Sequence, residues 1–373
     1  MKIKKLKIDK SMIFYIFILS ILSLISIYSA SMYLSKTLGN LVIKQSIWYL
    51  VGVIFIFLIF KFKLNFFIKI APYIYIANII LLFGLLFFAP EINGSKCWYV
   101  INGVGSFQPS EFMKISLILI EVYIIDKFKL KYKNPTVFQE FKMILLVGII
   151  FLIPSLITFL EPDTGAVIIY FIITIVILFI SNLRIRWFVF LFGTVLIFII
   201  SFFIIYFYKQ QLFIKIFGSD FFYRIDRVIN WKNGSGMQLE NSLAAIGSSG
   251  IIGHGFNKTP IYFPEAGTDF IFTVFASNFG FIGSLVLIII ILLLDIHIIK
   301  IGINSKNKTY KYIIAGVISI FFYQQIQNIS MTIGLLPITG ITLPFISYGG
   351  SSLLAYMILI GFCIYIYNEK NSA

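Results

Sequence analysis

The sequence predicts an all-α polytopic membrane protein whose residues 1–373 form one membrane domain with ten transmembrane helices. The first observation behind this prediction is composition, because 60% of the residues are hydrophobic and only 12% are charged. The second is a mean hydropathy of +0.98 over the chain. The third is that apolar stretches of about 20 residues, enough to cross a bilayer as a helix, recur along the whole sequence. A water-soluble protein could not hide that much apolar surface.

These apolar stretches mark the expected membrane spans. The first follows a run of lysines, and its apolar core is longer than that of a cleaved signal peptide, so we expect a retained helix. Neither an internal repeat of about 20–50 residues nor a matched pair of broken spans is present, which gives no support to a repeat array or an inverted-repeat transporter. The expected spans are 12–31, 41–60, 72–90, 109–126, 141–160, 164–182, 187–208, 269–299, 311–336 and 350–368.

Basic residues indicate the orientation, because lysine and arginine concentrate in short cytoplasmic loops. The formal net charge is +15, and most basic residues fall in alternate connections. Both termini are therefore predicted to be cytoplasmic, and the connection at about 209–268, between the seventh and eighth spans, to be extracytoplasmic. No basic run is interleaved with exposed aromatic residues in a soluble segment, which excludes nucleic acid as a partner. The basic clusters assigned to the inside lie at 2–10, 61–69, 127–142, 184–186 and 300–311.

The cysteines and histidines are few and scattered. Cys97 falls in an outside loop and Cys363 in the last span, so no disulfide is expected between them. His254 and His297 are the only histidines, and they are far apart in the sequence. None of the four residues has a partner at metal-ligand spacing, so no metal-ligating residue is predicted.

The first motif, Gln108-Pro109-Ser110-Glu111-Phe112-Met113-Lys114, opens the fourth span. Proline suits the first turn of a helix, and a glutamate there meets the positive end of the helix dipole. Glu111 and Lys114 share a helix face, so one interpretation is a capped helix start with a local ion pair. Because Lys114 lies inside the span, where a charge is unfavourable without a polar cavity or partner, we favour a functional role for the pair.

The second motif, Pro264-Glu265-Ala266-Gly267-Thr268-Asp269-Phe270, places two carboxylates at the edge of the membrane. One interpretation is that Thr268 caps the eighth span and Asp269 compensates its dipole. The other is that partial desolvation raises the pKa of a carboxylate and prepares it for general-base catalysis. The residues alone leave both interpretations open.

Two further motifs lie in predicted outside turns. The segment 343–352 is rich in glycine and serine; we expect most of it to pack tightly, with Ser351 or Ser352 as a helix cap. Backbone donors at such a helix start also favour anions. The turn Glu161-Pro162-Asp163-Thr164-Gly165 joins two spans. Asp163 either caps the following span, or helps to orient a base or hold a divalent cation such as magnesium or manganese.

The long outside connection divides into two parts. Phe221 to Trp231 has apolar residues at helical spacing, with Arg224 and Arg227 on another face, which predicts a short helix lying in the headgroup layer. These arginines either contact lipid phosphates or hold the diphosphate of a lipid-linked substrate. The following segment, SLAAIGSSGIIGHGF, is small, apolar and glycine-rich, so it either packs against the bundle or re-enters it.

The predicted location of the motifs limits the substrate. Outside the cell there is no pool of ATP or nucleotide sugars, and neither GxxxxGK[ST] nor GxGxxG after a strand occurs in the sequence. An outward-facing membrane enzyme needs a substrate that arrives already activated. A sugar carried on a lipid diphosphate meets that requirement.

The motifs FQPSEFMK, EPDTG, YRIDR, SLAAIGSSGIIGHG, PEAGTDFIF and GLLPITGITLPFISYGGSS closely resemble, in the same order, those of the SEDS family of RodA, FtsW and SpoVE. The resemblance implies ten helices and a peptidoglycan glycosyltransferase that polymerises lipid II with a class B penicillin-binding protein as its transpeptidase partner. It assigns the essential aspartate to Asp269, the motif glutamate and lysine to Glu111 and Lys114, and the turn aspartate to Asp163.

The chain departs from the family pattern at several positions. Gly267 stands where the family usually has histidine, and Ser277-Asn278 where it usually has two acids, which weakens the case for a cation there. Glu161 begins the turn that usually begins with glutamine, and Lys96-Cys97-Trp98 replaces a basic pair before tryptophan. QNISMTIGLLPITGI is more similar to elongation-type RodA, whereas YRIDR is more similar to division-type FtsW.

The resulting hypothesis is an inverting lipid II polymerase at the outer face of the bacterial cytoplasmic membrane, serving elongation and cell shape. Asp269 is the expected catalytic base, a divalent cation is allowed, and no organic cofactor is expected. The alternatives are a division- or sporulation-type polymerase, a lipid II flippase, or a scaffold that only recruits partners. The substrate-binding residues are expected to be Gln108, Glu111, Lys114, Asp163, Arg224, Arg227 and Ser351.

Overall fold

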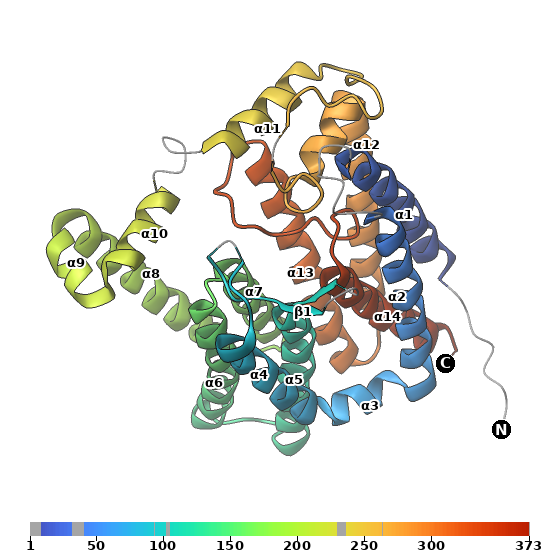
Figure 1. Ribbon diagram of the computed structural model, residues 1–373. Coiled ribbons are helices and arrows are strands. Elements are labelled where there is room, and N and C mark those ends of the chain that lie inside the picture. Colours follow the sequence, from blue (N-terminus) through green and yellow to red (C-terminus); the bar gives the residue numbers. More distant parts are fainter. Residues whose placement is uncertain are drawn as a thin grey trace.

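The computed structural model describes residues 9–31, 41–92, 94–101, 105–229, 236–262 and 264–372. Helices dominate this part of the chain (Figure 1), and every expected span coincides with one of them. The matching helices are α1 Lys10–Ser31, α2 Leu41–Phe62, α4 Ala71–Phe88, α5 Pro109–Lys131, α6 Val137–Leu160, α7 Thr164–Ile180, α8 Ile185–Tyr208, α12 Ile271–Asn304, α13 Lys308–Thr332 and α14 Gly350–Ser372.

Shorter elements connect these helices. A two-stranded antiparallel hairpin, β1 Tyr99–Ile101 and β2 Gly105–Phe107, pairs Val100 with Ser106 just before α5. The helix expected over Phe221 to Trp231 is confirmed as α10, although Trp231 lies outside the described residues. The long connection therefore contains regular structure. The short helices are α3 Leu64–Lys69, α9 Gln210–Phe217, α10 Ser219–Ile229 and α11 Gly236–Ser248.

Seven of the described helices are long and apolar enough to cross a membrane, namely α1, α2, α4, α6, α8, α12 and α14. The apolar helix α7 is shorter. Helices α5 and α13 are less apolar because they carry charged and amide side chains, including the buried Lys114 and Asn328. Both lie inside the bundle, where neighbouring helices shield polar groups from lipid. Their polar residues therefore keep α5 and α13 out of the set that length and hydropathy identify.

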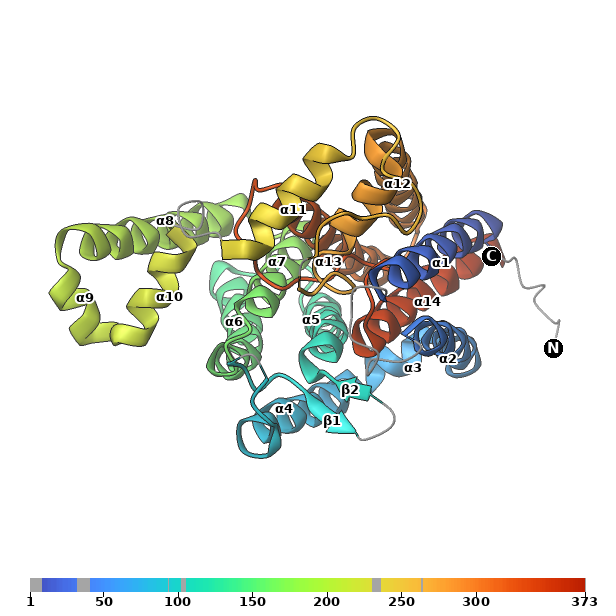
Figure 2. The same ribbon diagram turned by 45° about the horizontal axis from the view of Figure 1, so that its top comes forward.

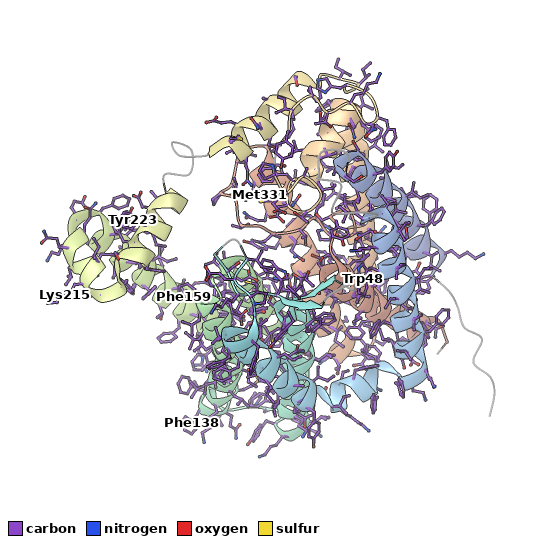
Figure 3. The ribbon with its side chains drawn as sticks, viewed as in Figure 1. Trp48, Phe138, Phe159, Lys215, Tyr223 and Met331 are labelled. Atoms are coloured by element: carbon purple, nitrogen blue, oxygen red, sulfur yellow. The ribbon has the colours of Figure 1, made fainter. Side chains whose placement is uncertain are left out.

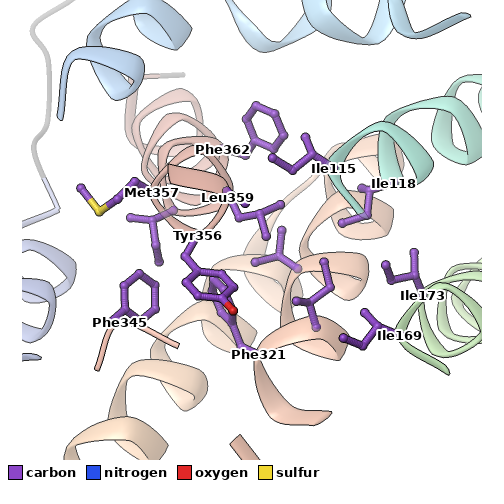
Figure 4. Close-up of a cluster of buried hydrophobic side chains, with 14 of the residues drawn as sticks. Ile115, Ile118, Ile169, Ile173, Phe321, Phe345, Tyr356, Met357, Leu359 and Phe362 are labelled. Atoms are coloured by element: carbon purple, nitrogen blue, oxygen red, sulfur yellow. The ribbon is translucent and has the colours of Figure 1, made fainter. Parts of the chain in front are cut away.

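The helices meet in a core that joins α5, α7, α13 and α14 (Figure 4). Tyr356 of α14 lies edge-on to Phe321 of α13, with ring centroids 5.9 Å apart. Gly316 brings α13 close to α5, because a Cβ at that position would lie 2.7 Å from Cγ1 of Ile118. Small residues allow such close approach of helices inside membranes.

Helices α8, α9 and α10 form an arm that projects from the rest of the bundle (Figures 1 and 2). The arm holds itself together with aromatic side chains, because Phe213 of α9 packs against Phe202 of α8 and Phe222 of α10. Along α8 most apolar side chains are exposed. In water such a surface would be a liability, whereas in a membrane protein it faces lipid.

The helix α12 is broken at Gly280, which has φ 64° and ψ −161°. The glycine-rich segment before it supplies hydrogen-bond partners at the break. The carbonyl groups of Gly250 and Ile251 accept hydrogen bonds from the N–H groups of Phe281 and Ile282 at 3.0 and 3.1 Å. His254 and Gly255 donate their N–H groups to the carbonyl groups of Ser277 and Asn278 at 3.0 and 3.1 Å. The segment SLAAIGSSGIIGHGF thus packs against the bundle, as one of the two expectations had it. The break itself was not predicted, since we expected an uninterrupted span.

Candidate active site

Asp269 lies at the end of a tight turn that leads into α12. Its carbonyl oxygen accepts a hydrogen bond at 2.8 Å from the Nδ2 group of Asn328 on α13. Its carboxylate faces the segment between α13 and α14, because a Cβ placed on Gly340 would lie 3.4 Å from Asp269 Oδ2. The backbone of the base candidate is therefore held in place. Its carboxylate faces Gly340 of the neighbouring segment, which has no side chain to cover it.

The glycine- and serine-rich segment 343–352 clamps the backbone before Asp269. Tyr348 donates its N–H to the carbonyl of Gly267 at 2.8 Å, and Ser347 Oγ donates to the carbonyl of Thr268 at 2.6 Å. The same Ser347 Oγ accepts the N–H of Leu343 at 2.8 Å. Tight packing was the expected role for most of this motif, and these contacts confirm it.

Burial and neighbouring acids raise the proton affinity of the Asp269 carboxylate. Burial raises the pKa of Asp269 to about 7, and repulsion from Glu265 and then Asp163 adds to the effect. A carboxylate with a pKa near the working pH combines a useful ionised fraction with real proton affinity. Glu265 itself is exposed, and its carboxylate accepts a hydrogen bond at 2.8 Å from Thr268 Oγ1.

Asp163 ties together the starts of three helices. Its Oδ1 accepts the N–H of Ala166 at 3.0 Å and so caps α7. Its Oδ2 accepts hydrogen bonds at 3.2 Å from Gln108 Nε2 and from Ser110 Oγ. The N–H of Gln108 donates at 3.0 Å to Ser351 Oγ at the start of α14. The capping role considered for Asp163 is confirmed, and Gln108 and Ser351 belong to the same network.

Glu161 is buried in the same turn. Among the described residues, neither of its carboxylate oxygens has a hydrogen-bond partner. Burial, followed by repulsion from Asp163, raises the pKa of Glu161 to about 8. The neighbouring Cys97 donates its thiol to the backbone carbonyl of Glu161 at 3.1 Å, and it is a free, buried cysteine, as is Cys363.

Glu111 and Lys114 form the predicted ion pair, with Lys114 Nζ 2.7 Å from Glu111 Oε2. The lysine side chain is 1% exposed and that of the glutamate 12%. Lys114 Nζ also lies 5.6 Å from the centre of the Tyr356 ring. The Tyr356 hydroxyl accepts a hydrogen bond from Gln324 and shares another with Thr342, two residues after Gly340. The pair is thus connected to the segment beside Asp269 through one aromatic side chain.

Arg224 and Arg227 lie on α10 in the projecting arm, and their side chains are outside the described part of the structure. Within the described residues, no three His, Cys, Asp or Glu side chains come close enough to hold a metal ion. The described residues therefore do not supply a protein-only site for the divalent cation that the sequence allowed.

Sequence reasoning missed two residues that support the site from behind. Asn328 and Gln324 are buried amides that bind the backbone of Asp269 and the hydroxyl of Tyr356, respectively. A usable signal was present for the two amides, because polar side chains are rare in apolar spans and usually have a specific partner there.

Comparison with known proteins agrees with this architecture. The profile of the FtsW/RodA/SpoVE family, described as cell cycle protein, matches residues 9–372. A probable peptidoglycan glycosyltransferase FtsW from Wigglesworthia glossinidia brevipalpis is 32% identical over 95% of this chain and 92% of its own length. Stage V sporulation protein E of Bacillus subtilis is 34% identical over 72% of this chain and 70% of its own length.

Solved structures share the fold. A chain from a peptidoglycan synthase complex that coordinates polymerization and crosslinking aligns with a TM-score of 0.79, at 21% identity, over 97% of this chain and 98% of that one. The rod shape determining protein RodA of Thermus thermophilus aligns with a TM-score of 0.69, at 21% identity, over 98% of each chain. From the profile match and these relatives together, the chain belongs to the FtsW/RodA/SpoVE family, which is also called SEDS.

Proposed function

We propose that this chain is a peptidoglycan glycosyltransferase that polymerises lipid II at the outer face of the bacterial cytoplasmic membrane. The observation that carries the proposal is the clamped, partly buried Asp269, whose pKa is raised to about 7. The names of the FtsW relatives support the same activity. A carboxylate with a raised pKa, close to a membrane, suits general-base catalysis of a reaction between two lipid-borne sugars.

In the proposed reaction, Asp269 takes the proton from the 4-hydroxyl group of the acceptor sugar. The oxygen forms a bond to the anomeric carbon of the donor, and the bond from that carbon to the diphosphate breaks. The polyprenyl diphosphate leaves with the electron pair, and the configuration at the anomeric carbon is inverted.

Lys114 is the proposed partner for the negative charge that develops on the departing diphosphate. Its ion pair with Glu111 fixes the position of the ammonium group. Arg224 and Arg227 remain the further candidates, from their sequence pattern, for contacting the diphosphate. Gln108, Asp163 and Ser351 are the remaining proposed substrate-binding residues. Their hydrogen bonds connect the starts of α5, α7 and α14. The proposed reaction uses no divalent cation. Titration with a chelator tests whether the polymerisation rate depends on one.

The chain could serve cell elongation, division or sporulation. The segment QNISMTIGLLPITGI predicted a role in elongation, whereas several relatives between 32% and 35% identity bear the name FtsW. These names favour division over the elongation role, with sporulation as a further possibility from the SpoVE relative. Complementation of conditional division and elongation mutants distinguishes the three.

We also propose a protein partner and an orientation of the chain in the membrane. A class B penicillin-binding protein is the proposed partner, supported by the fold shared with a chain of a polymerising and crosslinking complex. Ten spans with both termini inside would place Asp269 outside and the ends of α5 and α12 inside. Cysteine accessibility at positions near both ends tests this arrangement.

The decisive experiment uses the purified chain in detergent with lipid II. Asp269→Asn is expected to abolish glycan synthesis, while the control Asp126→Asn, at the opposite end of α5 and bound to Thr309, retains it. A flippase gives no polymer in this assay, because it moves lipid II without forming a glycosidic bond. A scaffold gives no polymer with the unaltered chain or with either variant. Polymer made by the Asp269→Asn variant would exclude Asp269 as the base.

A further inference from the structure

A groove of about 360 Å³ lies between the last turns of α5 and the first turns of α6. It is at the end of the bundle away from Asp269, since α5 begins beside the candidate site and its 23 residues extend about 33 Å from it. In Figure 3 Phe138 lies at the lower end of the bundle, and Met331, near the end of α13, lies well above it. We call it the basic groove; its lining residues are Tyr123, Ile124, Lys127, Phe128, Lys131, Tyr132, Gln139, Lys142, Met143 and Leu146.

The basic groove has a charged mouth and an apolar depth. On α5, Lys131 lies at the mouth and Tyr123 and Ile124 lie two turns deeper, about 12 Å along the helix. Helix α6 runs the other way, so Gln139 is at the mouth and Leu146 is deep. Met143 is buried against the groove, whereas Leu146 is exposed toward the side of the bundle. A charged mouth above an apolar slot matches a lipid with one headgroup and long chains.

The three lysines of the basic groove contact aromatic rings and not carboxylates. Lys127 Nζ lies 4.4 Å from the centre of the Tyr123 ring, and Lys142 Nζ lies 4.5 Å from that of Phe138. Lys131 Nζ lies 5.3 Å from the ring of Tyr132. Among the described residues none of the three forms an ion pair. Their positive charge is therefore not neutralised within this part of the chain.

Neighbouring charged residues bind partners outside the groove, so the charged side chains that line the groove are all positive. Glu140 turns away, pairing with Arg184 at 3.4 Å and accepting a hydrogen bond from Trp187 Nε1 at 2.7 Å. Lys129, between two groove lysines in the sequence, turns into the bundle and donates to the Tyr312 hydroxyl at 2.9 Å. The selection of lysines at the groove thus follows from the helical face and not from the local density of lysine.

We propose that the basic groove binds an anionic phospholipid of the cytoplasmic leaflet. The phosphate lies among Lys127, Lys131 and Lys142, and an acyl chain lies along Ile124, Met143 and Leu146. Basic pockets between membrane helices on the cytoplasmic side bind acidic headgroups in this manner. The apolar depth and the exposed Leu146 favour a lipid over a water-soluble phosphate. The inference rests on the orientation proposed above and is independent of the proposed catalysis.

The test is native mass spectrometry of the full chain with equal amounts of phosphatidylglycerol and phosphatidylcholine that carry the same acyl chains. Each lysine near a membrane surface contributes a factor of about five to the binding of an acidic lipid, so three contribute a factor on the order of a hundred. The preference for phosphatidylglycerol is therefore expected to fall by about that factor in the triple variant K127Q, K131Q and K142Q. The matched control is K133Q, K306Q and K308Q, which removes as many charges from exposed positions of the same end outside the groove.

Two further arms identify the source of the phosphate. Met143→Trp fills the apolar slot without altering the lysines, and it is expected to release the lipid; circular dichroism checks that the helices persist. Inorganic phosphate alone is expected to give no comparable binding. The proposal is overturned if the two triple variants lose the preference equally, if Met143→Trp retains the lipid, or if inorganic phosphate binds as well as the lipid does.

Discussion

Asn328 donates its side-chain amide to the backbone carbonyl of Asp269 at 2.8 Å, and the same amide donates to the carbonyl of Ile341 at 2.7 Å. One buried side chain of α13 therefore fixes both the turn that bears the candidate base and the segment facing it. Neither bond touches the carboxylate. Asn328 is accordingly a positioning residue, whose loss should displace Asp269 without altering its chemistry.

Asn328→Ala is expected to lower the polymerisation rate by a factor of roughly ten to a hundred, since a small misplacement of a reacting group has effects of that size. It should also reduce stability by about 1–3 kcal/mol for each carbonyl left unpaired. The lipid II assay and a thermal melt measure the two effects. Ser330→Ala, a small polar change on the same helix, serves as the control. A variant with normal rate and normal melting temperature would exclude the positioning role.

The rate of polymerisation is expected to rise with pH through about 7, because the base must be ionised and burial raises the pKa of Asp269 to about 7. Repulsion from Glu265 is the second cause of this raised pKa. Glu265→Gln removes that charge, so the acidic limb of the pH profile should move to lower pH. Profiles of kcat/KM from about pH 5 to pH 9 test both statements. An acidic limb that stays in place in Glu265→Gln would contradict the electrostatic account.

Asp269→Asn is expected to melt at a higher temperature than the unaltered chain at pH 8, despite its inactivity. A carboxyl group whose pKa is raised on folding from 3.8 to about 7 binds its proton more tightly in the folded state. The ionised group therefore reduces stability progressively between those two pH values, and the full reduction persists above them. Removing the charge should restore roughly 1–3 kcal/mol at pH 8 and less at pH 5. A constant difference in melting temperature across this range would argue against a perturbed Asp269.

Much of the fold was predictable because each span carries its own local signal. Apolar stretches of sufficient length identified all ten of the matching helices, although the eighth span was expected to begin at Asp269, two residues before α12 starts. The ion pair of Glu111 and Lys114 followed from helical spacing. These features depend on residues close together in the sequence, so a single sequence contains them.

The rest depends on contacts between distant residues. Asn328 was one amide among several in its span, and only the packing of α13 against the turn before α12 makes it the donor to Asp269. The break at Gly280 has no local signature, because glycines are common within membrane helices and the segment that repairs the break comes from positions 250–255. The projection of α8 likewise reflects missing neighbours, which its own apolar sequence does not reveal.

Lys114→Met is expected to destabilise the bundle, because it leaves Glu111 facing a nearly dry neighbourhood without its partner. Breaking a buried pair from one side costs about 3–5 kcal/mol, whereas removing both charges is far less harmful. The double variant of Glu111→Gln and Lys114→Met should therefore recover most of the melting temperature. Its polymerisation should stay low if Lys114 offsets charge on the diphosphate. Recovery of stability and rate together would make the pair purely structural.

Gly253→Ala is expected to be strongly destabilising, because its φ is +82° and a Cβ would lie 2.2 Å from the carbonyl oxygen of Asn278. Backbone strain of this kind costs about 1–3 kcal/mol before the collision with backbone is included. Gly247→Ala is the matched control: Gly247 lies in α11 and a Cβ there meets no atom within 4 Å. That substitution should stabilise the helix by about 0.5–1 kcal/mol.

The consequence of Gly253→Ala should extend to catalysis, because the segment it disrupts satisfies the backbone at the break in α12. The half of α12 before Gly280 starts directly after Asp269 and Phe270. Loosening that half should displace the base, so the polymerisation rate measured well below the melting temperature is expected to fall. The pH at which the rate is half-maximal should also move toward the ordinary range of a carboxyl group as water reaches Asp269. A variant that melts early but keeps both the rate and the pH profile would show that the repaired break stabilises the fold without positioning the base.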